Sequence, residues 1–232
     1  MTTLSQSSSR PRRRRNLAEE VADHIRDAIL TGSMKPGERI DQDQISDELG
    51  ISRLPVREAL IALHGEGLVR TIPRRGTYVE RLTPNDITDH YQLFGHMAGL
   101  AASRAAARAT DDQVAQMRRL HDEMADITDP GELERINYEL HRVINVAGGS
   151  RRLNILIDLL ARSLPQHFYG MNPEWSGEAQ EHHADIIEAI AARDPSSAQR
   201  AMEGHMQASA RYAVDALRRQ GFFDSGADLD EE

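Results

Sequence analysis

Arg53 and Arg57 lie four positions apart, a spacing that puts both side chains on one face of a helix. The run before them, from Ile45 to Gly50, has the pattern of a short amphipathic helix that ends at a glycine turn. A guanidinium group offers five N–H donors in a planar fork, which suits the edge of guanine or a phosphate. This pattern predicts two helices joined by a turn, with the second helix entering the major groove of DNA.

Two residues of this segment have a second explanation each. Ser52 either bonds a phosphate or caps the helix that begins beside it. Arg57 either contacts DNA or pairs with an acidic side chain near Glu58 or with Asp47. Because no core role requires two arginines here, we favour DNA contact for both Arg53 and Arg57.

A second group of residues has the chemistry of metal ligands. Asn137 and His141 are spaced i, i+4, whereas His183 and His205 stand on two later helices, 22 residues apart. Imidazoles suit Zn, Ni, Mn or Fe, and three of them with one oxygen leave positions open for water or an organic acid. Ten histidines in one chain make such a spacing common by accident, and a single buried histidine is usually structural.

The elements that position the arginines are those of a winged helix. Apolar periodicity and turn residues predict three helices and then a hairpin whose tip carries Arg74, Arg75 and Gly76, suited to the minor groove. The expected helices are 17–30, 41–49 and 52–64, and the expected strands are 68–72 and 77–80.

From Thr83 onward the pattern is helical almost to the end of the chain. Gly95 and Gly99 fall inside a helix, at a cost of roughly 1 kcal/mol each against alanine. Close helix packing at that point, or a kink, would explain them. The expected helices are 84–109, 111–127, 130–147, 150–169, 176–193 and 195–219, with Thr83, Thr110, Asp129 and Asp194 as their caps.

The sequence therefore predicts a mainly α protein in four parts. Residues 1–16 form a disordered basic tail, which is either a solvated segment or an arm that adds phosphate contacts. Residues 17–81 form the winged helix-turn-helix, residues 82–219 an all-helical bundle, and residues 220–232 an acidic flexible tail.

Composition limits the classes of protein. The absence of cysteine excludes disulfides and thiolate metal sites and favours a reducing cytoplasm. No apolar stretch approaches the ~20 residues of a membrane helix, and the Arg- and Ser-rich start does not resemble a secretory signal. Residues 1–80 hold 13 basic and 12 acidic residues, against 15 and 25 in the remainder. This difference in charge between the two parts predicts that DNA binding resides in residues 1–80.

The N-terminal third resembles the winged-helix domain of GntR-family regulators. The matching runs are Ala28 to Ile40, Leu49 to Leu60 and Gly76 to Val79. Members of that family are homodimeric repressors, or sometimes activators, whose recognition helices read a short palindrome and respond to a small metabolite. The resemblance implies that Arg53 and Arg57 face the groove. Asp43 stands where many relatives carry a basic residue, so the operator cannot be taken from them.

The helical remainder resembles the FadR-type C-terminal domain, the FCD class, over Ile136 to Ile144, Gly148 to Leu153 and His183 to Ile190. In that class a metal is often held at the positions of Asn137, His141, His183 and His205, and the carboxylate of the effector joins its coordination. Counting back from Ile190 makes His183 the ligand and leaves His182 exposed.

Two departures from the FCD pattern bear on ligand binding. Asn137 replaces an aspartate that many metal-binding members use, which removes one negative charge. The segment from Phe94 to Gly99 lacks the arginine and glutamate that relatives often show four residues apart. Arg142 and Arg162 are candidate contacts for an anionic effector, with surface ion pairing as the alternative for each.

The resulting hypothesis is a DNA-binding transcriptional regulator, by expectation a repressor, controlled by an organic acid and not an enzyme. The alternative is a small helical metalloenzyme with a three-histidine site. That alternative leaves residues 17–80 unexplained, and the chain contains no HExxH motif or nucleophile motif. An architectural DNA-binding protein would not need the long acidic helical part.

Overall fold

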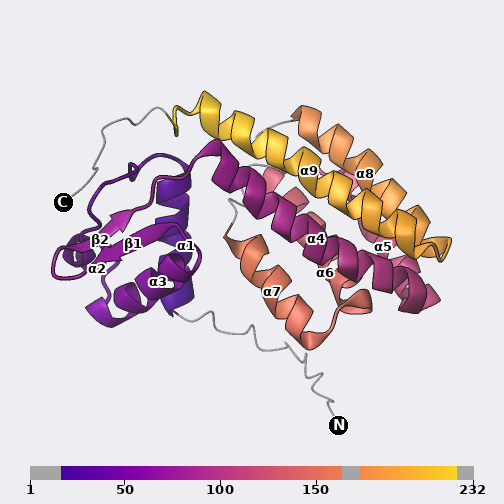
Figure 1. Cartoon of the computed structure of the whole chain (residues 1–232), viewed down its shortest axis with the longest axis horizontal. Coiled ribbons are helices and arrows are strands. Elements are labelled where there is room, and N and C mark those ends of the chain that lie inside the picture. The colour runs from indigo at the N-terminus through magenta and orange to yellow at the C-terminus, as the bar shows by residue number, and fades with distance from the viewer. Residues whose placement is uncertain (1–16, 164–172, 224–232) are drawn as a thin grey trace, which may run out of the picture.

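The computed structural model describes residues 17–163 and 173–223, and it describes the side chains of the second segment from residue 177 onward. Within these residues, nine helices and one two-stranded sheet form a winged helix followed by a helical bundle (Figure 1). The predicted tail 1–16 and most of the predicted tail 220–232 lie outside the described residues. The mainly α class predicted from the sequence is confirmed.

The winged helix consists of three helices and a hairpin. Apolar side chains at one-turn intervals make α1 an amphipathic helix, and its buried residues Val21, Ile25 and Ile29 belong to the same core as Val56 and Leu63 of α3. The elements are α1 (Leu17–Leu30), α2 (Gln42–Glu48), α3 (Arg53–Gly65), β1 (Val69–Ile72) and β2 (Gly76–Val79).

The turn between α2 and α3 is fixed by local hydrogen bonds. Asp41 caps α2, because its side chain accepts from the backbone N–H groups of Asp43 and Gln44. Gly50 has φ +63°, the left-handed conformation predicted for the turn. The buried hydroxyl of Ser46 donates to the carbonyl of Ile51 at 2.8 Å, and the Ile51 N–H donates back to the Ser46 carbonyl at 3.0 Å. Two hydrogen bonds between the same pair of residues therefore fix the angle between α2 and α3.

The hairpin is antiparallel, with Val69 opposite Val79 and Ile72 opposite Gly76. Gly76 is thus the first residue of β2, whereas the sequence had placed it in the turn. Arg39 pairs with Tyr78 as an additional bridge, which ties the segment before α2 to β2, on the side opposite β1.

The helical bundle is built around α4, which packs on α6, α7, α8 and, along most of its length, α9. Figure 1 shows α4 beginning beside the winged helix and running away from it, with α9 returning alongside. Buried apolar residues of the winged helix and the bundle form one contiguous cluster. The helices are α4 (Pro84–Arg108), α5 (Asp111–Ala125), α6 (Pro130–Gly148), α7 (Arg151–Arg162), α8 (Pro173–Ala191) and α9 (Pro195–Arg219).

The predicted caps are confirmed at Thr83, Thr110, Asp129 and Asp194, each of which accepts backbone N–H groups of the helix that follows. The least accurate boundaries lie around α7 and α8. Residues 150–169 were predicted as one helix, but α7 ends at Arg162, and residues 164–172 lie outside the described part. Helix α8 begins at Pro173, three residues before the predicted start.

Close packing, not a kink at α4, explains the helical glycines. A Cβ at Gly95 would lie 3.1 Å from the Cβ of Met206, and one at Gly99 would lie 2.9 Å from the Cγ of Glu203, both on α9. Gly148 at the end of α6 is tighter still, since its Cβ would lie 1.7 Å from the carbonyl oxygen of Ala101. The absence of side chains lets α9 and α6 approach the backbone of α4.

The first residues after α9 pack against the core. Phe222 is 4% exposed, and its N–H donates to the carbonyl of Leu217, while the Gly221 N–H donates to that of Arg218. This bonding pattern ends a helix with an apolar residue folded back on its last turn. The predicted flexible tail from residue 220 is therefore wrong for Phe222, whose side chain belongs to the core.

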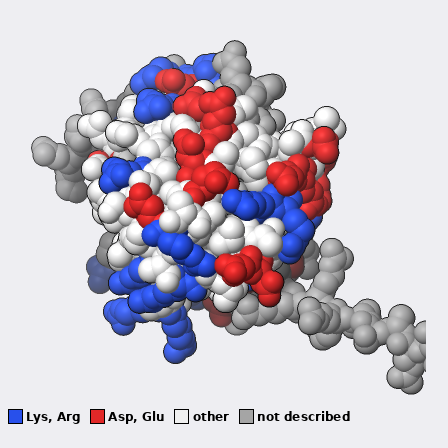
Figure 2. All heavy atoms as spheres, turned by 90° about the vertical axis from the view of Figure 1, so that its right-hand side faces the viewer, with Lys and Arg blue, Asp and Glu red and all other residues white. Residues whose placement is uncertain are grey.

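Charges of both signs cover the end of the bundle that Figure 2 faces, where α4 ends and α9 begins. Among the described residues, Arg193 bonds Asp111 at 3.0 Å, which joins the turn before α9 to the start of α5. Acidic and basic side chains are interspersed over most of this face, and a group of basic side chains gathers at its lower left in Figure 2. None of the described helices is long and apolar enough to cross a membrane.

Candidate DNA-binding surface and metal site

The exposed start of α3 presents four side chains. Ser52, Arg53, Leu54 and Arg57 are all exposed, while Val56 on the opposite face is fully buried. Ser52 occupies the N-cap position, but its side chain makes no capping hydrogen bond, so the predicted capping role is wrong. Arg57 forms no ion pair within the described residues, in contrast to the alternative that it pairs with an acidic neighbour. The Ser52 hydroxyl and the Arg57 guanidinium group are therefore available to a ligand outside the chain.

Arg53 does have a partner. Its Nε lies 2.6 Å from Oδ1 of Asp43 on α2, and the two side chains are 70% and 57% exposed. The pairing crosses the turn between α2 and α3. The sequence marks Asp43 as unusual for the family but gives no sign of its pairing with Arg53.

The wing carries the other basic side chains. Arg74 and Arg75 are exposed in the turn between β1 and β2, and neither forms an ion pair with any residue that the structure describes. Arg74 has φ +64°, a conformation uncommon for residues other than glycine. A Cβ at Gly76 would lie 2.9 Å from Nε of Arg39, so the missing side chain makes room for this guanidinium. Arg39 is thus a third basic residue at the wing, one that was not predicted because it precedes the turn of the hairpin by more than thirty residues.

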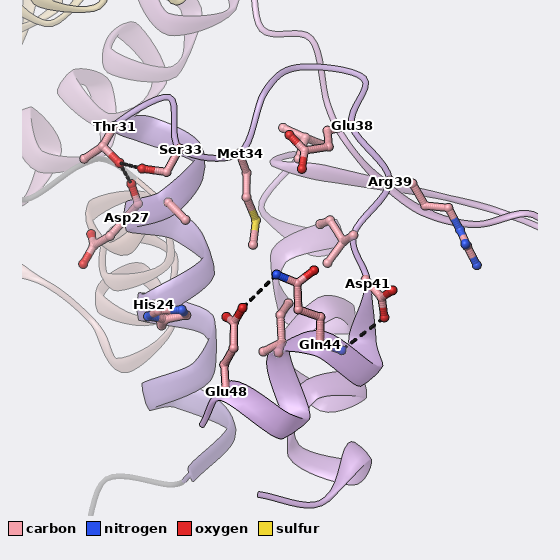
Figure 3. Close-up of a pocket in the computed structure, with 14 residues that line it drawn as sticks. His24, Asp27, Thr31, Ser33, Met34, Glu38, Arg39, Asp41, Gln44 and Glu48 are labelled. Carbon is pink, nitrogen blue, oxygen red and sulfur yellow. Dashed lines mark hydrogen bonds between the residues drawn. The ribbon is translucent and has the colours of Figure 1, made fainter. Parts of the chain in front are cut away.

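A hollow of about 440 Å³ lies behind this surface, between α1, α2 and the segment that joins them (Figure 3). Polar side chains line it, and several of them bond one another: Gln44 donates to Glu48 at 2.7 Å, and Thr31 and Ser33 share a hydrogen bond of 3.2 Å. Arg39 points away from the hollow, toward the wing side (Figure 3). The polar groups are largely satisfied within the chain, so the hollow does not define a ligand site.

Three histidines from three helices converge inside the bundle. His141 on α6, His183 on α8 and His205 on α9 are 9%, 2% and 3% exposed. One potential ligand nitrogen from each lies within 4.8 Å of the others. The ring centroids are 4.6 Å apart for His183 and His205 and 5.1 Å apart for His141 and His205. The structure therefore brings together the three histidines predicted as ligands.

Burial keeps these rings neutral. It lowers the pKa of His141 to about 4, and it holds the pKa of His183 and of His205 well below the usual range, with the neighbouring imidazoles acting in the same direction. A neutral imidazole has a lone pair to donate. Nδ1 of His141 and both ring nitrogens of His183 are buried without a hydrogen-bond partner in the described part of the chain. Buried polar atoms left unpaired are costly, and a metal ion would satisfy them.

Asn137 and His182 lie next to the histidine cluster. Asn137 lies one turn before His141 on α6 and is half-buried, consistent with its predicted place on the same helix face. His182 is not one of the three converging residues, but its ring lies 5.8 Å, centroid to centroid, from that of His205. Its Nε2 lies 3.9 Å from Oε1 of Glu178, and its ring is half-buried rather than exposed as predicted.

The candidate effector arginines make surface ion pairs. Arg142 is exposed and bonds Glu139 one turn earlier, at 2.6 and 2.7 Å. Arg162 is exposed as well, and its Nη1 lies 3.8 Å from Oε1 of Glu19 on α1. Surface pairing was the alternative expectation for both residues. The Arg162 pair also connects the last turn of α7 to the winged helix.

Family comparisons agree with this arrangement. Residues 17–79 match the profile of the bacterial regulatory proteins of the gntR family, and residues 89–208 match that of the FCD domain. The structure of E. coli McbR/YncC superposes with a TM-score of 0.65 and 21% identity, over 88% of this chain and 98% of that one. A putative GntR regulator from Rhodococcus sp. RHA1 gives 0.60 and 24%, over 86% and 98%.

Curated relatives are regulators as well. An uncharacterized HTH-type transcriptional regulator of Mycobacterium tuberculosis is 28% identical over 202 residues, which is 87% of this chain and 83% of that protein. The E. coli transcriptional repressor RspR is 26% identical over 191 residues, which is 79% and 82% of the two chains. These relatives do not favour the metalloenzyme alternative. The chain belongs to the GntR family, as a DNA-binding transcriptional regulator with a C-terminal FCD domain.

Proposed function

We propose that this regulator is a repressor whose operator affinity is controlled by a small carboxylate-bearing metabolite bound beside a metal ion in the helical bundle. The observation that carries the proposal is the buried cluster of His141, His183 and His205, whose ligand nitrogens lie within 4.8 Å of one another. Such a cluster has no evident packing role, because apolar side chains would fill the same space without unpaired polar atoms.

The donor set fits a divalent ion such as Zn, Ni, Mn or Fe. Three neutral imidazoles would hold it, and Asn137 would add a neutral oxygen from the same helix face as His141. A bound ion supplies the positive charge that attracts the carboxylate of an effector. This role matters here because the segment from Phe94 to Gly99 contributes no cation: Phe94 and Ala98 are buried in the core, and His96 bonds Glu203.

DNA binding is assigned to the front of the chain. Arg53 and Arg57 would read base edges in the major groove, with Ser52 on a phosphate, and Arg74, Arg75 and Gly76 would form the wing contact. The exposed guanidinium groups of Arg57, Arg74 and Arg75, which lack partners in the described chain, support this assignment. Residues 17–81 would act as the DNA-binding domain, with residues 1–16 as an arm on the phosphates.

A homodimer is proposed as the working unit, so that two winged helices meet a palindrome. Residues 82–219 would form both the effector-binding and the dimerisation domain, followed by the tail 220–232. Exposed apolar side chains on two packed helices of this part support the assignment, because a second copy would remove them from water. They are Leu93 and Leu100 on α4, and Ile155, Leu156 and Leu159 on α7.

DNA binding is tested with purified protein and duplexes from its own promoter region. We expect a mobility shift at a palindromic site that weakens steeply with salt, and we expect Arg53→Ala to abolish it. Arg118→Ala is the matched control, because Arg118 is an exposed arginine of the bundle paired with Glu188. Retained binding by Arg53→Ala would remove Arg53 from the reading surface.

Effector control is tested by thermal-shift screening of organic acids, sugar acids and amino acids, with and without chelator. We expect an acid that stabilises only the metal-loaded protein and that weakens operator binding. A triple substitution of His141, His183 and His205 by alanine should retain operator binding and lose the response. An acid that acts equally on chelated protein would contradict the metal-dependent pocket.

A further inference from the structure

The ion pair between Asp43 and Arg53 lies at the leading end of the helix proposed to enter the major groove. Nε of Arg53 and Oδ1 of Asp43 form an ion pair with a separation of 2.6 Å. The carboxylate lies against the Nε side of the guanidinium group, which carries one of its five N–H donors. The four N–H donors on the two terminal nitrogens remain outside this contact, and a guanine edge requires two of them.

Both members of the pair stand on a fixed frame. Asp43 lies in the first turn of α2, where its own N–H donates to the Asp41 cap at 2.9 Å. Arg53 is the first residue of α3, and the Ser46–Ile51 hydrogen bonds hold α3 against α2. The relative position of Asp43 and Arg53 is therefore set by two packed helices and not by a flexible loop.

The energetics favour a role in recognition over a role in stability. Side chains that are 70% and 57% exposed form an ion pair worth little to folding, because water competes for both charges. The pair also places a negative charge beside the positive one, which weakens attraction to phosphate. Hydrogen bonds to a base edge depend on the direction of the donors, and a guanidinium held at Nε loses less conformational freedom when it binds. The arrangement therefore suits base reading better than phosphate binding.

We infer that Asp43 is a specificity-determining residue: it orients the Arg53 guanidinium so that its terminal nitrogens bind one guanine of the operator. The inference rests on the proposed role of Arg53 in DNA reading and adds the residue that sets its direction. Asp43 itself needs no contact with DNA and acts as a positioning residue. In contact with DNA, where water is displaced, the pair would strengthen.

The experiment selects binding sites from a randomised duplex pool with wild-type protein, Arg53→Ala, Asp43→Ala and Asp47→Ala. Asp47 is the matched control, because it is an exposed aspartate one turn later on α2 and makes no ion pair with a described residue. The position at which Arg53→Ala loses the guanine preference identifies the base that Arg53 reads. Affinities are then measured for the selected site and for its guanine-to-adenine variant at that position.

Wild-type protein and Asp47→Ala should prefer guanine at that position to the same extent. Asp43→Ala should lower the preference on the order of tenfold, the scale of one bidentate base contact. Asp43→Asn, which keeps an acceptor without its charge, should fall between them. Circular dichroism and thermal unfolding should show all four variants folded, since each replaced side chain is exposed.

Three outcomes separate the inference from the function on which it rests. An Arg53-dependent guanine preference that Asp43→Ala leaves intact overturns the inference alone. A uniform gain of affinity in Asp43→Ala, larger than in Asp47→Ala and with unchanged base preference, overturns it as well, because Asp43 would then compete with DNA for Arg53. A wild-type protein that enriches no sequence, or Arg53→Ala that selects the same bases as wild type, contradicts the proposed function and the inference together.

Discussion

The imidazole of His183 on α8 lies 4.6 Å, centroid to centroid, from that of His205 on α9, with an angle of 49° between the ring planes. Both rings are almost completely buried, and His141 of α6 completes the group. Three helices thus meet at three polar rings inside the bundle.

Metal content is the most direct test of the cluster. Protein purified without chelator should contain close to one divalent ion per chain, and His183→Ala should lose it because one of three imidazole ligands is gone. Elemental analysis measures the content. His96→Ala is the control, since His96 is an exposed histidine of α4 that lies outside the converging group. Wild-type protein with no stoichiometric metal would contradict the site.

The stability of the metal-free protein should depend on pH. Because burial lowers the pKa of His141 to about 4, the unfolded chain binds a proton between pH 6.5 and 4 that the folded chain does not. Unfolding is therefore favoured as the pH falls through this window. His141 alone should reduce the free energy of unfolding by about 2 kcal/mol between pH 8 and pH 5, and the other two rings act in the same direction.

Urea unfolding of chelated protein at the two pH values measures this loss. His141→Phe, which keeps a ring but cannot bind a proton, should reduce the pH dependence. An equal dependence in both proteins would show that His141 is charged in the folded state, or exposed to water, at pH 5.

The wing should contribute affinity without sequence preference. Arg75→Ala removes an exposed guanidinium near the backbone of the duplex, so binding should weaken to a similar degree for every sequence. The slope of log affinity against log salt concentration should fall by about 1. Fluorescence anisotropy at several salt concentrations measures both effects. A change in base preference at one position, with an unchanged slope, would instead make Arg75 a reader of bases.

Two helical glycines should respond oppositely to alanine. A Cβ at Gly148 would overlap the backbone of α4 at Ala101, so Gly148→Ala should force α6 and α4 apart and destabilise the fold by about 3 kcal/mol. Gly204 lies inside α9 with nothing within 4 Å of a Cβ, so Gly204→Ala should stabilise by about 1 kcal/mol through helix propensity. Denaturant unfolding of both variants compares the two effects. Equal shifts would mean that the α4–α6 contact is looser than described.

Local signals were sufficient to predict the elements. Helix starts at Pro84 and Asp111 follow from caps that bond the backbone within three residues, and the sequence contains the whole interaction. Contacts between distant residues were harder to predict. Nothing local indicates that Arg162 would reach Glu19, or that Phe222 would return to the core beyond the last helix.

The candidate sites show the same division. The i, i+4 spacing of Arg53 and Arg57 indicates a shared face, yet the partner of Arg53 lies ten residues earlier, across a turn whose angle the sequence does not state. The convergence of His141, His183 and His205 followed from the family resemblance, because three rings on separate helices meet only through tertiary packing.

Helix α4 has a mechanical consequence for regulation. Its 25 residues make a rod about 37 Å long that starts five residues after the last residue of the wing. A rod of that length converts a tilt of 5° at one end into a displacement of about 3 Å at the other, close to the rise of one base pair. Under the proposed function, modest repacking in the bundle would therefore be enough, in geometric terms, to shift the winged helix along the DNA by about one base pair.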